Sequence, residues 1–180
     1  MRDLQAARGT TLSGRRKGIG WIAVGIGLFG LGLDQVVKKA SLTYLEPGRP
    51  VDLVGDVFRL NLIWNPGAAF GMGASATIFF TVFAIAALVG CLAIGLPRIT
   101  RLWHGVTLGM LMAGISGNLV DRFTQPPAPL HGHVVDMFQL KHFAIFNVAD
   151  VFITAAAATI LIGSFVFDDT RAKAPEGKTA

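Results

Sequence analysis

The sequence contains few charged residues. Only 15% of its 180 residues are Asp, Glu, Lys or Arg, whereas 52% are hydrophobic, and the mean hydropathy is +0.56. A chain with so little charge is too apolar for an ordinary soluble protein, so the composition predicts a membrane protein of about one domain. The net charge of +5 does not indicate a nucleic-acid partner, because the basic residues stand between long uncharged runs and form no cluster.

Cysteine is also scarce, since Cys91 is the only one in the chain. An intramolecular disulfide is therefore excluded, and the redox compartment stays open. Residues 88–91 read LVGC, which resembles the lipobox of a lipoprotein precursor, yet they lie deep inside a long apolar run. We expect Cys91 to pack as a small apolar side chain.

Four apolar stretches are long enough to cross about 30 Å of hydrocarbon. They cover residues 18–37, 76–96, 102–120 and 147–167. Ten of the sixteen basic residues fall on one side of these stretches, namely Arg2, Arg8, Arg15, Arg16, Lys17, Arg98, Arg101, Arg171, Lys173 and Lys178. By the positive-inside rule both termini face the cytoplasm. No small-residue cleavage site follows Leu33, so the first stretch is expected to remain as an uncleaved anchor in the inner membrane.

The predicted organisation is one four-span domain over residues 18–167. The tails at 1–17 and 168–180 show no hydrophobic periodicity and are expected to be disordered and cytoplasmic. Two segments, 40–75 and 121–147, must then face the periplasm or the cell exterior. These two segments hold most of the polar side chains that could carry chemistry.

The first outer segment predicts a β-strand over residues 58–65. Apolar and polar side chains alternate there with the period of two that is typical of a strand, and Asn65-Pro66-Gly67 ends it as a turn. The second outer segment contains a Pro-rich stretch at 125–129 that cannot be helical and is expected to be an extended loop. The predicted fold is an all-α membrane protein with four transmembrane helices, a small periplasmic β-sheet on the lipid surface and a periplasmic loop.

Four carboxylates are predicted to converge on the outer face. Asp34, Asp121 and Asp150 stand at the outer ends of the first, third and fourth spans, and Asp136 lies in the apolar stretch 134–138. Ionisable groups at membrane depth are costly and usually functional. Two neighbouring carboxyl groups share a proton, so that one acts as a base and the other as an acid. This arrangement is suited to the hydrolysis of an amide bond by water.

Several of these residues also fit purely structural roles. Asp34 and Lys38 are spaced i, i+4 and can form an ion pair at a helix end. Asn147 can cap the fourth span. Support of the fold by salt bridges or backbone hydrogen bonds is equally open to Asn65, Asn118, Asp121 and Arg122. Asp136 and Asp150 have no basic residue within four positions, which favours them as a catalytic pair.

Two other kinds of site deserve comparison. Residues 114–117 look like the Gly-x-Ser-Gly of rhomboid serine proteases, with Ser116 as the nucleophile, but none of the histidines lies on a span near it. His131, His133 and Asp136 could ligate a metal, although a loop after Pro-rich sequence gives them no fixed frame. We therefore expect neither a metal nor another cofactor.

Five short blocks together resemble the lipoprotein signal peptidases, also called signal peptidase II. They are DQVVK at 34–38, NPGAAFG at 65–71, GISGNLVDR at 114–122, HVVDMF at 133–138 and FNVAD at 146–150. The blocks follow one another in the order of that family, and each falls at the predicted outer face.

The resemblance implies that Asp136 and Asp150 are the catalytic dyad of an aspartic endopeptidase. It assigns substrate-binding or supporting roles to Asp34, Lys38, Asn65, Gly114, Asn118, Asp121, Arg122, Asn147 and Ala149. It implies an outer sheet, membrane lipids as partners, and as substrates prolipoproteins whose lipobox Cys carries diacylglycerol and is preceded by the cleaved bond. The chain departs from the family in having Ala113-Gly114 in place of paired glycines and a long Pro-rich loop.

A small proton- or ion-coupled transporter is the alternative from another class of protein. It would use the same carboxylates to relay charge, but the spans contain no charged group between their outer and inner ends, and no internal repeat is visible. A non-catalytic membrane chaperone for lipoproteins is the remaining alternative, which an activity assay would separate.

Overall fold

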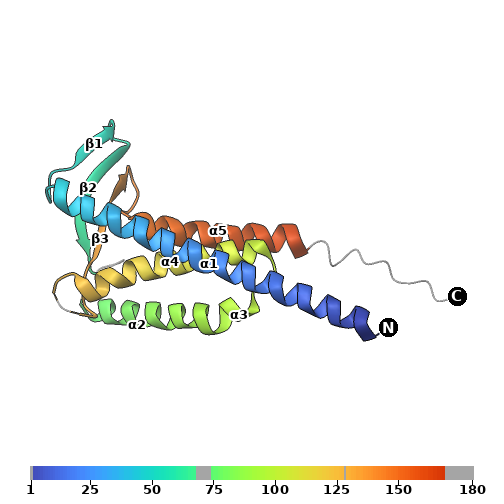
Figure 1. The fold of residues 1–180 in the computed structure, drawn as a ribbon. Helices are drawn as coiled ribbons and strands as arrows, with labels where there is room; N and C mark the ends of the chain where they lie inside the picture. The colour runs from blue at the N-terminus through green and yellow to red at the C-terminus, as the bar shows by residue number, and fades with distance from the viewer. Residues whose placement is uncertain (1, 68–73, 128, 169–180) are drawn as a thin grey trace.

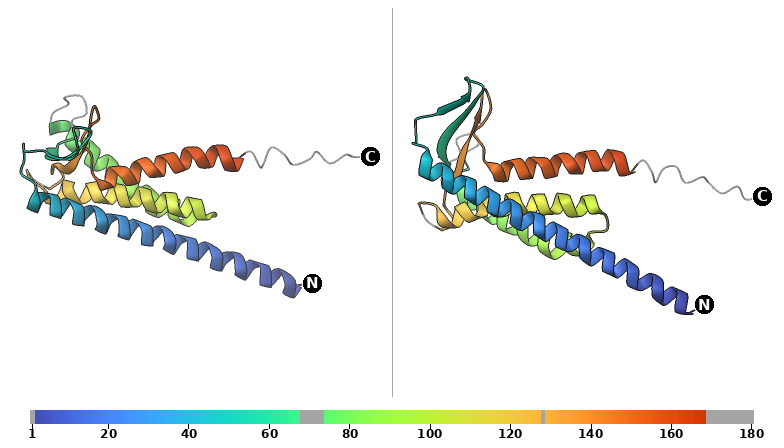
Figure 2. Two further views of the ribbon diagram at one scale, coloured as in Figure 1. Left: turned by 90° about the horizontal axis from the view of Figure 1, so that it is seen from above. Right: turned by 45° about the horizontal axis from the view of Figure 1, so that its top comes forward.

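A computed structural model describes residues 2–67, 74–127 and 129–168. Four long helices run side by side, and a small sheet stands at one end of them (Figure 1). The helices are α1 (Arg2–Tyr44), α2 (Ala74–Gly90), α4 (Leu102–Thr124) and α5 (Val148–Asp168). A π-helical turn, η2 (Cys91–Gly95), and the short α3 (Leu96–Arg98) continue α2. The start of α1 and the end of α5 both point away from the sheet (Figure 2).

In the described part of the chain, three helices are long and apolar enough to cross a membrane. The qualifying stretches are Gly18–Tyr44, Thr77–Arg98 and Val148–Phe165. Large apolar side chains cover their outer surfaces, and Phe29 and Phe79 are 70% and 65% exposed. Such surfaces are favourable against lipid tails but not against water, and a helix satisfies its backbone groups internally. The predicted multi-pass membrane protein is confirmed.

The fourth predicted span corresponds to α4, which does not meet the same criterion of length and hydropathy. This helix contacts all three of the others, α1, α2 and α5. Its glycines and polar side chains are buried against these neighbours, so its sequence needs less apolar surface. At 23 residues it is about 34 Å long, enough to span the hydrocarbon. A count of four spans therefore stays a prediction.

The ends of α1 differ from those predicted. The helix begins at Arg2 and continues to Tyr44, so the expected disordered tail over 1–17 is wrong from Arg2 onward. The stretch contains no Pro, and each residue added to an existing helix gains one backbone hydrogen bond, which makes extension easier than nucleation. Residues 169–180 of the other predicted tail lie outside the described residues.

The sheet has three antiparallel strands in the order β1 (Val51–Val54), β2 (Phe58–Asn65) and β3 (Val134–Leu140). The alternating pattern predicted β2 with its observed bounds. In contrast, no strand was predicted at β3, which lies in the second outer segment, where a periplasmic loop was expected. It is a strand because its backbone groups pair with β2, with Ile63 opposite Asp136.

One face of the sheet packs on the end of α1. Leu62, Val135 and Met137 are buried there against Val37 and Leu45. Successive side chains of a strand point to opposite faces. Asp136 lies between Val135 and Met137, so its side chain points away from this apolar core and toward the start of α5.

The other main core joins α1, α4 and the end of α2. Cys91 is 8% exposed and packs there with Ala23, Ile99 and Met112. This confirms the expectation that the single cysteine serves as a small apolar core residue.

Helix α4 approaches its neighbours closely at its glycines, two of which lie near the carboxylate end. A Cβ atom on Gly114 would lie 2.5 Å from the carbonyl oxygen of Ala149, and one on Gly117 would lie 2.6 Å from Asp34 Oδ2. Small residues allow backbones of membrane helices to come this near. The Ala113-Gly114 pair thus retains the glycine that the contact with α5 requires.

Gly117→Ala is expected to lower the free energy of unfolding by about 1–3 kcal/mol, because the added methyl overpacks the contact with Asp34. Thermal unfolding of the purified protein in detergent measures this change. Gly32→Ala on α1 is the matched control, since no atom lies within 4 Å of its added Cβ. The control should be neutral or stabilising by up to about 1 kcal/mol; equal losses in both variants would contradict the close contact.

Candidate active site

The start of α5 is closed by a reciprocal pair of side chains. Asn147 Oδ1 accepts a hydrogen bond from the backbone N–H of Asp150 at 3.0 Å, and Asp150 Oδ2 accepts one from the backbone N–H of Asn147 at 3.2 Å. This is the geometry of a capping box, in which each side chain satisfies a free backbone donor of the first turn. The predicted cap at Asn147 is confirmed, and it fixes the carboxylate of Asp150.

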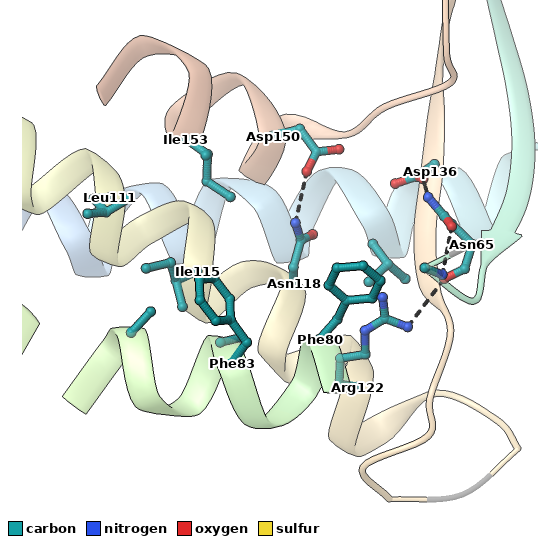
Figure 3. A pocket seen from close by; sticks show the side chains of 14 residues that line it. Asn65, Phe80, Phe83, Leu111, Ile115, Asn118, Arg122, Asp136, Asp150 and Ile153 are labelled. Atoms are coloured by element: carbon teal, nitrogen blue, oxygen red, sulfur yellow. Dashed lines mark hydrogen bonds between the residues drawn. The ribbon is translucent and has the colours of Figure 1, made fainter. Parts of the chain in front are cut away.

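The two carboxyl groups of Asp136 and Asp150 are held by three asparagine side chains. Asp136 Oδ1 accepts from Asn147 Nδ2 at 2.6 Å, and its Oδ2 accepts from Asn65 Nδ2 at 2.9 Å. Asp150 Oδ1 accepts from Asn118 Nδ2 at 2.9 Å (Figure 3). Asn147 contacts both carboxyl groups, because its backbone N–H also donates to Asp150. Strand β3 and helix α5 therefore present their carboxylates to one site.

A buried cation stands behind this site. Lys38 Nζ lies 2.9 Å from Asp34 Oδ2 and 2.7 Å from Asp121 Oδ2, and all three side chains are at most 3% exposed. Nζ also donates to Asn118 Oδ1 at 3.1 Å. Since Asn118 in turn donates to Asp150, the cation is connected to the site through one amide side chain.

The carboxylates around Lys38 also bind backbone of the other elements. Asp34 Oδ1 accepts from the N–H of Ala149 on α5 at 2.8 Å, and Asp121 Oδ2 accepts from the N–H of Val135 on β3 at 3.1 Å. The cluster of Asp34, Lys38 and Asp121 thus ties α1, α4, α5 and the sheet together. The expected i, i+4 pair of Asp34 and Lys38 is confirmed.

Arg122 supports the fold through backbone hydrogen bonds, one of the structural roles that was open from the sequence. Its Nη1 donates to the carbonyl oxygens of Gly132 at 2.9 Å and of Asn65 at 3.4 Å. Successive helical residues point about 100° apart, so Asp121 faces Lys38 while Arg122 reaches the outer loops. The turn after β2 also holds Asn65, whose Oδ1 accepts from the N–H of Gly67 at 2.9 Å; Gly67 has a φ of +91°, which favours glycine.

Both carboxyl groups line one cavity of about 560 Å³ (Figure 3). Its polar end is formed by Asp136 and Asp150 with Asn65, Asn118 and Arg122. The remaining side chains on its walls are apolar: Phe80, Phe83, Ala84, Ala87, Leu111, Ile115, Val134 and Ile153. A polar centre beside a long apolar wall suits a substrate that is itself amphiphilic.

Burial shifts the protonation of Asp136, which is 1% exposed. The pKa of its carboxyl group is raised to about 6: loss of hydration is the largest cause, the charge of Asp150 also raises it, and the hydrogen bonds from Asn65 and Asn147 oppose the rise. Near pH 6 the carboxyl group of Asp136 can therefore hold a proton.

The two alternative sites are not assembled. Ser116 Oγ donates back to the carbonyl oxygen of Met112 at 2.6 Å, and no described histidine hydrogen-bonds to it. His131 Nδ1 lies 3.4 Å from the carbonyl oxygen of Pro129. Within the described ranges no three His, Cys, Asp or Glu side chains gather closely enough to hold a metal ion, so His131, His133 and Asp136 do not form the ligand set that was open from the sequence.

Sequence reasoning missed four residues that contribute to the site, namely Gln35, Gly117, Phe80 and Phe83. Gln35 Nε2 donates to the carbonyl oxygen of Gly117 at 3.1 Å, and Phe80 and Phe83 form the wall from α2. Gly117 had a signal, because it follows Gly114 at a spacing that lies on one helix face. Nothing in the sequence indicated the two phenylalanines, since α2 is apolar on all sides and its pattern does not show which side faces the cavity.

Comparisons with known proteins all point to the same family. The pattern of the family described as signal peptidase (SPase) II matches residues 26–166. The lipoprotein signal peptidase of Mycolicibacterium smegmatis is 38% identical over 150 residues, which are 82% of this chain and 63% of that protein. That of Mycobacterium tuberculosis is 41% identical over 139 residues, 77% of this chain and 68% of that protein. The chain thus spans less than two thirds of the first relative.

A solved structure of similar shape agrees with this. The structure described as a bacterial membrane enzyme determined by the in meso method at 2.3 Å resolution has a TM-score of 0.72 and 26% sequence identity. The similarity covers 88% of this chain and 94% of that one. This chain is therefore similar to the named relatives in sequence and to a solved membrane enzyme in fold.

Proposed function

The chain belongs to the signal peptidase II family, a family of membrane peptidases, and from this premise we propose that it removes the signal peptide from prolipoproteins by aspartic catalysis. The proposed substrate carries diacylglycerol on its lipobox Cys, and the cleaved bond immediately precedes that Cys. The relatives named above are called lipoprotein signal peptidases, which supports the substrate class. Nothing in the comparisons supports a transporter.

One observation carries the proposal of an aspartic dyad. Asp136 and Asp150 line the same apolar-walled cavity, are bridged by Asn147, and have surroundings that retain a proton on Asp136. A protonated carboxyl beside an ionised one supplies both partners of general acid–base catalysis.

The reaction follows from this division of roles. Asp150 removes a proton from a water molecule, and the resulting hydroxide attacks the scissile carbonyl carbon while the carboxyl of Asp136 donates its proton to the carbonyl oxygen. On collapse of the tetrahedral intermediate the C–N bond breaks, the proton on Asp150 passes to the leaving amine, and one hydroxyl of the intermediate returns its proton to Asp136 as the carbonyl re-forms. Both carboxyl groups are then in their starting states, so no metal or other cofactor is required.

The supporting residues act in this scheme through position. Asn65, Asn118 and Asn147 hold the carboxyl groups, and the Lys38 cluster braces Asn118. Arg122 lies at the polar end of the cavity and is suited to bind a substrate carbonyl. Gly114 and Ala149 allow α4 and α5 to approach closely.

The proposed setting is the bacterial inner membrane. Residues 18–167 would form one four-span domain, with both termini in the cytoplasm and the sheet and site at the periplasmic face. The alternation of basic flanks along the sequence supports this orientation. The lipid of the substrate could then stay in the bilayer while its peptide bond reaches the carboxyl groups.

Purified full-length protein should cleave a diacylglyceryl-modified lipobox peptide and leave the same peptide without lipid uncut. Mass spectrometry of the products locates the cleaved bond. Cleavage should continue in the presence of a metal chelator. Lack of cleavage of the lipidated peptide would overturn the proposed substrate, and loss of cleavage with chelator would overturn a metal-free mechanism.

The pH dependence of stability tests the protonation of Asp136. Its pKa is raised from 3.8 in the unfolded chain to about 6 in the fold. The protonated carboxyl of Asp136 therefore contributes fully to the free energy of unfolding below pH 3.8. This contribution is lost as the pH rises through about 6, where the buried group must ionise. Between about pH 4 and about pH 7, wild-type protein should lose more thermal stability than Asp136→Asn does.

Asp52→Asn serves as the control for this measurement, because the side chain of Asp52 is 57% exposed. It should follow the wild-type curve. Parallel curves for wild type and Asp136→Asn would show that Asp136 is ionised throughout this range and would remove the acid from the proposed mechanism.

A further inference from the structure

A second cavity lies at the end of the bundle away from the sheet, where α3, α4 and α5 meet (Figure 1). Its volume is about 340 Å³. The lining residues include Arg98, Trp103, Thr107, Leu108, Leu111 and Ile160. Leu111 is the one residue that it shares with the lining of the cavity around the dyad, so the two cavities open at different levels of the bundle.

The rim of this cavity favours an anion. Arg98 lines it and Arg101 immediately precedes α4. The first turn of α4 contains no acidic residue and no side chain caps it, so its backbone N–H groups and the positive end of the helix dipole remain available. Arg98 donates one N–H to the carbonyl oxygen of Ile94 at 3.3 Å, and a guanidinium has five such donors.

A buried hydroxyl group lies below this rim. Helical Thr and Ser side chains can donate to the carbonyl oxygen four residues earlier, as Thr124, Thr159 and Ser164 do at 2.8 Å. Thr107 is also helical, is 6% exposed and lines the cavity, yet its Oγ1 has no hydrogen-bond partner among the described residues. A buried hydroxyl without a partner is unfavourable, so a ligand with an acceptor atom at this depth would be favoured.

The basic rim, the Thr107 hydroxyl and the apolar wall follow one another along α4, and this order indicates the class of ligand. Thr107 lies five residues after Leu102, or about 7.5 Å further along the helix, and Leu108, Leu111 and Ile160 form the apolar wall beyond. A glycerophospholipid presents the same order, with an anionic phosphate, then ester carbonyl oxygens, then acyl chains. Free phosphate would leave both the hydroxyl and the apolar wall without a partner. Trp103 stands in the first turn of α4, and Trp is enriched where membrane helices end at the interface.

We propose that this cavity is a binding site for an anionic glycerophospholipid of the leaflet opposite the sheet. The phosphate binds Arg98, Arg101 and the first turn of α4, and an ester carbonyl oxygen accepts a hydrogen bond from Thr107. The site is separate from the peptidase chemistry and does not depend on the proposed substrate.

Trp103 allows a direct test, because the chain has three tryptophans and only this one lines the cavity. In full-length protein with Trp21→Phe and Trp64→Phe, the fluorescence of Trp103 is measured in phosphatidylcholine vesicles. Brominated phosphatidylglycerol or brominated phosphatidylcholine is then added in matched amounts. The relative affinity for phosphatidylglycerol should exceed that for phosphatidylcholine by about 25-fold, because each of the two arginines near the anionic lipid is expected to contribute about fivefold.

Three variants separate the contacts. Arg98→Gln and Arg101→Gln should each reduce this preference by about fivefold, whereas Thr107→Val should weaken quenching by both lipids because both contain ester carbonyls. Arg49→Gln, an exposed change at the sheet end, is the charge control and should have no effect. Equal quenching by both lipids, or displacement of brominated lipid by inorganic phosphate, would overturn the proposal.

Discussion

Asp136→Asn and Asp150→Asn are each expected to lower kcat for cleavage of the lipidated peptide by at least about 10³-fold, because each removes one partner of the acid–base pair. Neither change alters the size of the side chain, so the variants should still fold. Single-turnover cleavage, followed by mass spectrometry of the released signal peptide, measures the loss. The double variant should be no less active than the weaker single variant, since the two groups act as a unit.

Ser116→Ala provides the matched control for the dyad. Ser116 donates to its own helix and does not line the cavity, so its loss should change kcat by less than about threefold. Full activity in either Asp variant, or loss of activity in Ser116→Ala, would be incompatible with the aspartic mechanism.

Lys38→Met is expected to lower the free energy of unfolding by about 3–5 kcal/mol, because it leaves the carboxylates of Asp34 and Asp121 buried without a cation. The methionine side chain is similar in length, so packing is largely preserved. Thermal unfolding in detergent measures the change, and a low melting temperature should accompany any loss of activity.

Lys39→Met is the natural control, since Lys39 is the next residue and is exposed. It should change the free energy of unfolding by less than about 0.5 kcal/mol. Adding Asp34→Asn and Asp121→Asn to Lys38→Met removes the uncompensated charges and should restore part of the stability. An undiminished melting temperature for Lys38→Met alone would mean that the ion cluster contributes nothing to the fold.

The elements that depend on local sequence could be predicted. The apolar runs indicated the membrane helices, and the alternation in 58–65 indicated β2 with its bounds. A capping role for Asn147 followed from the preference of asparagine for helix starts. These features rest on neighbours within a few positions, which a single sequence displays directly.

The spacing of the four carboxylates along the sequence could not predict which two pair with Lys38 and which two face the cavity. Asp34 and Asp121 pair with Lys38, whereas Asp136 and Asp150 share the asparagines, although all four come from outer ends of elements. Which group meets the cation depends on how α1 and α4 rotate against each other. That rotation is set by contacts such as the one between Gly117 and Asp34. These two residues are 83 positions apart in the chain, so their contact leaves no local sequence pattern.

Strand β3 was missed for a related reason. Its residues are buried on both faces, so they lack the alternation that indicates a half-exposed strand. Only pairing with β2 defines it, and that pairing places Asp136 opposite Ile63.

The capping box at the start of α5 has a consequence for inhibitor resistance. Asn147 and Asp150 satisfy each other's backbone N–H groups, and Asn147 also holds Asp136. A drug that binds these side chains therefore contacts residues whose exchange would weaken the cap of α5 and remove a contact that positions the carboxyl groups. Escape mutations would have to arise elsewhere, on the apolar walls from α2 such as Phe80 and Phe83, where one hydrophobic residue can replace another.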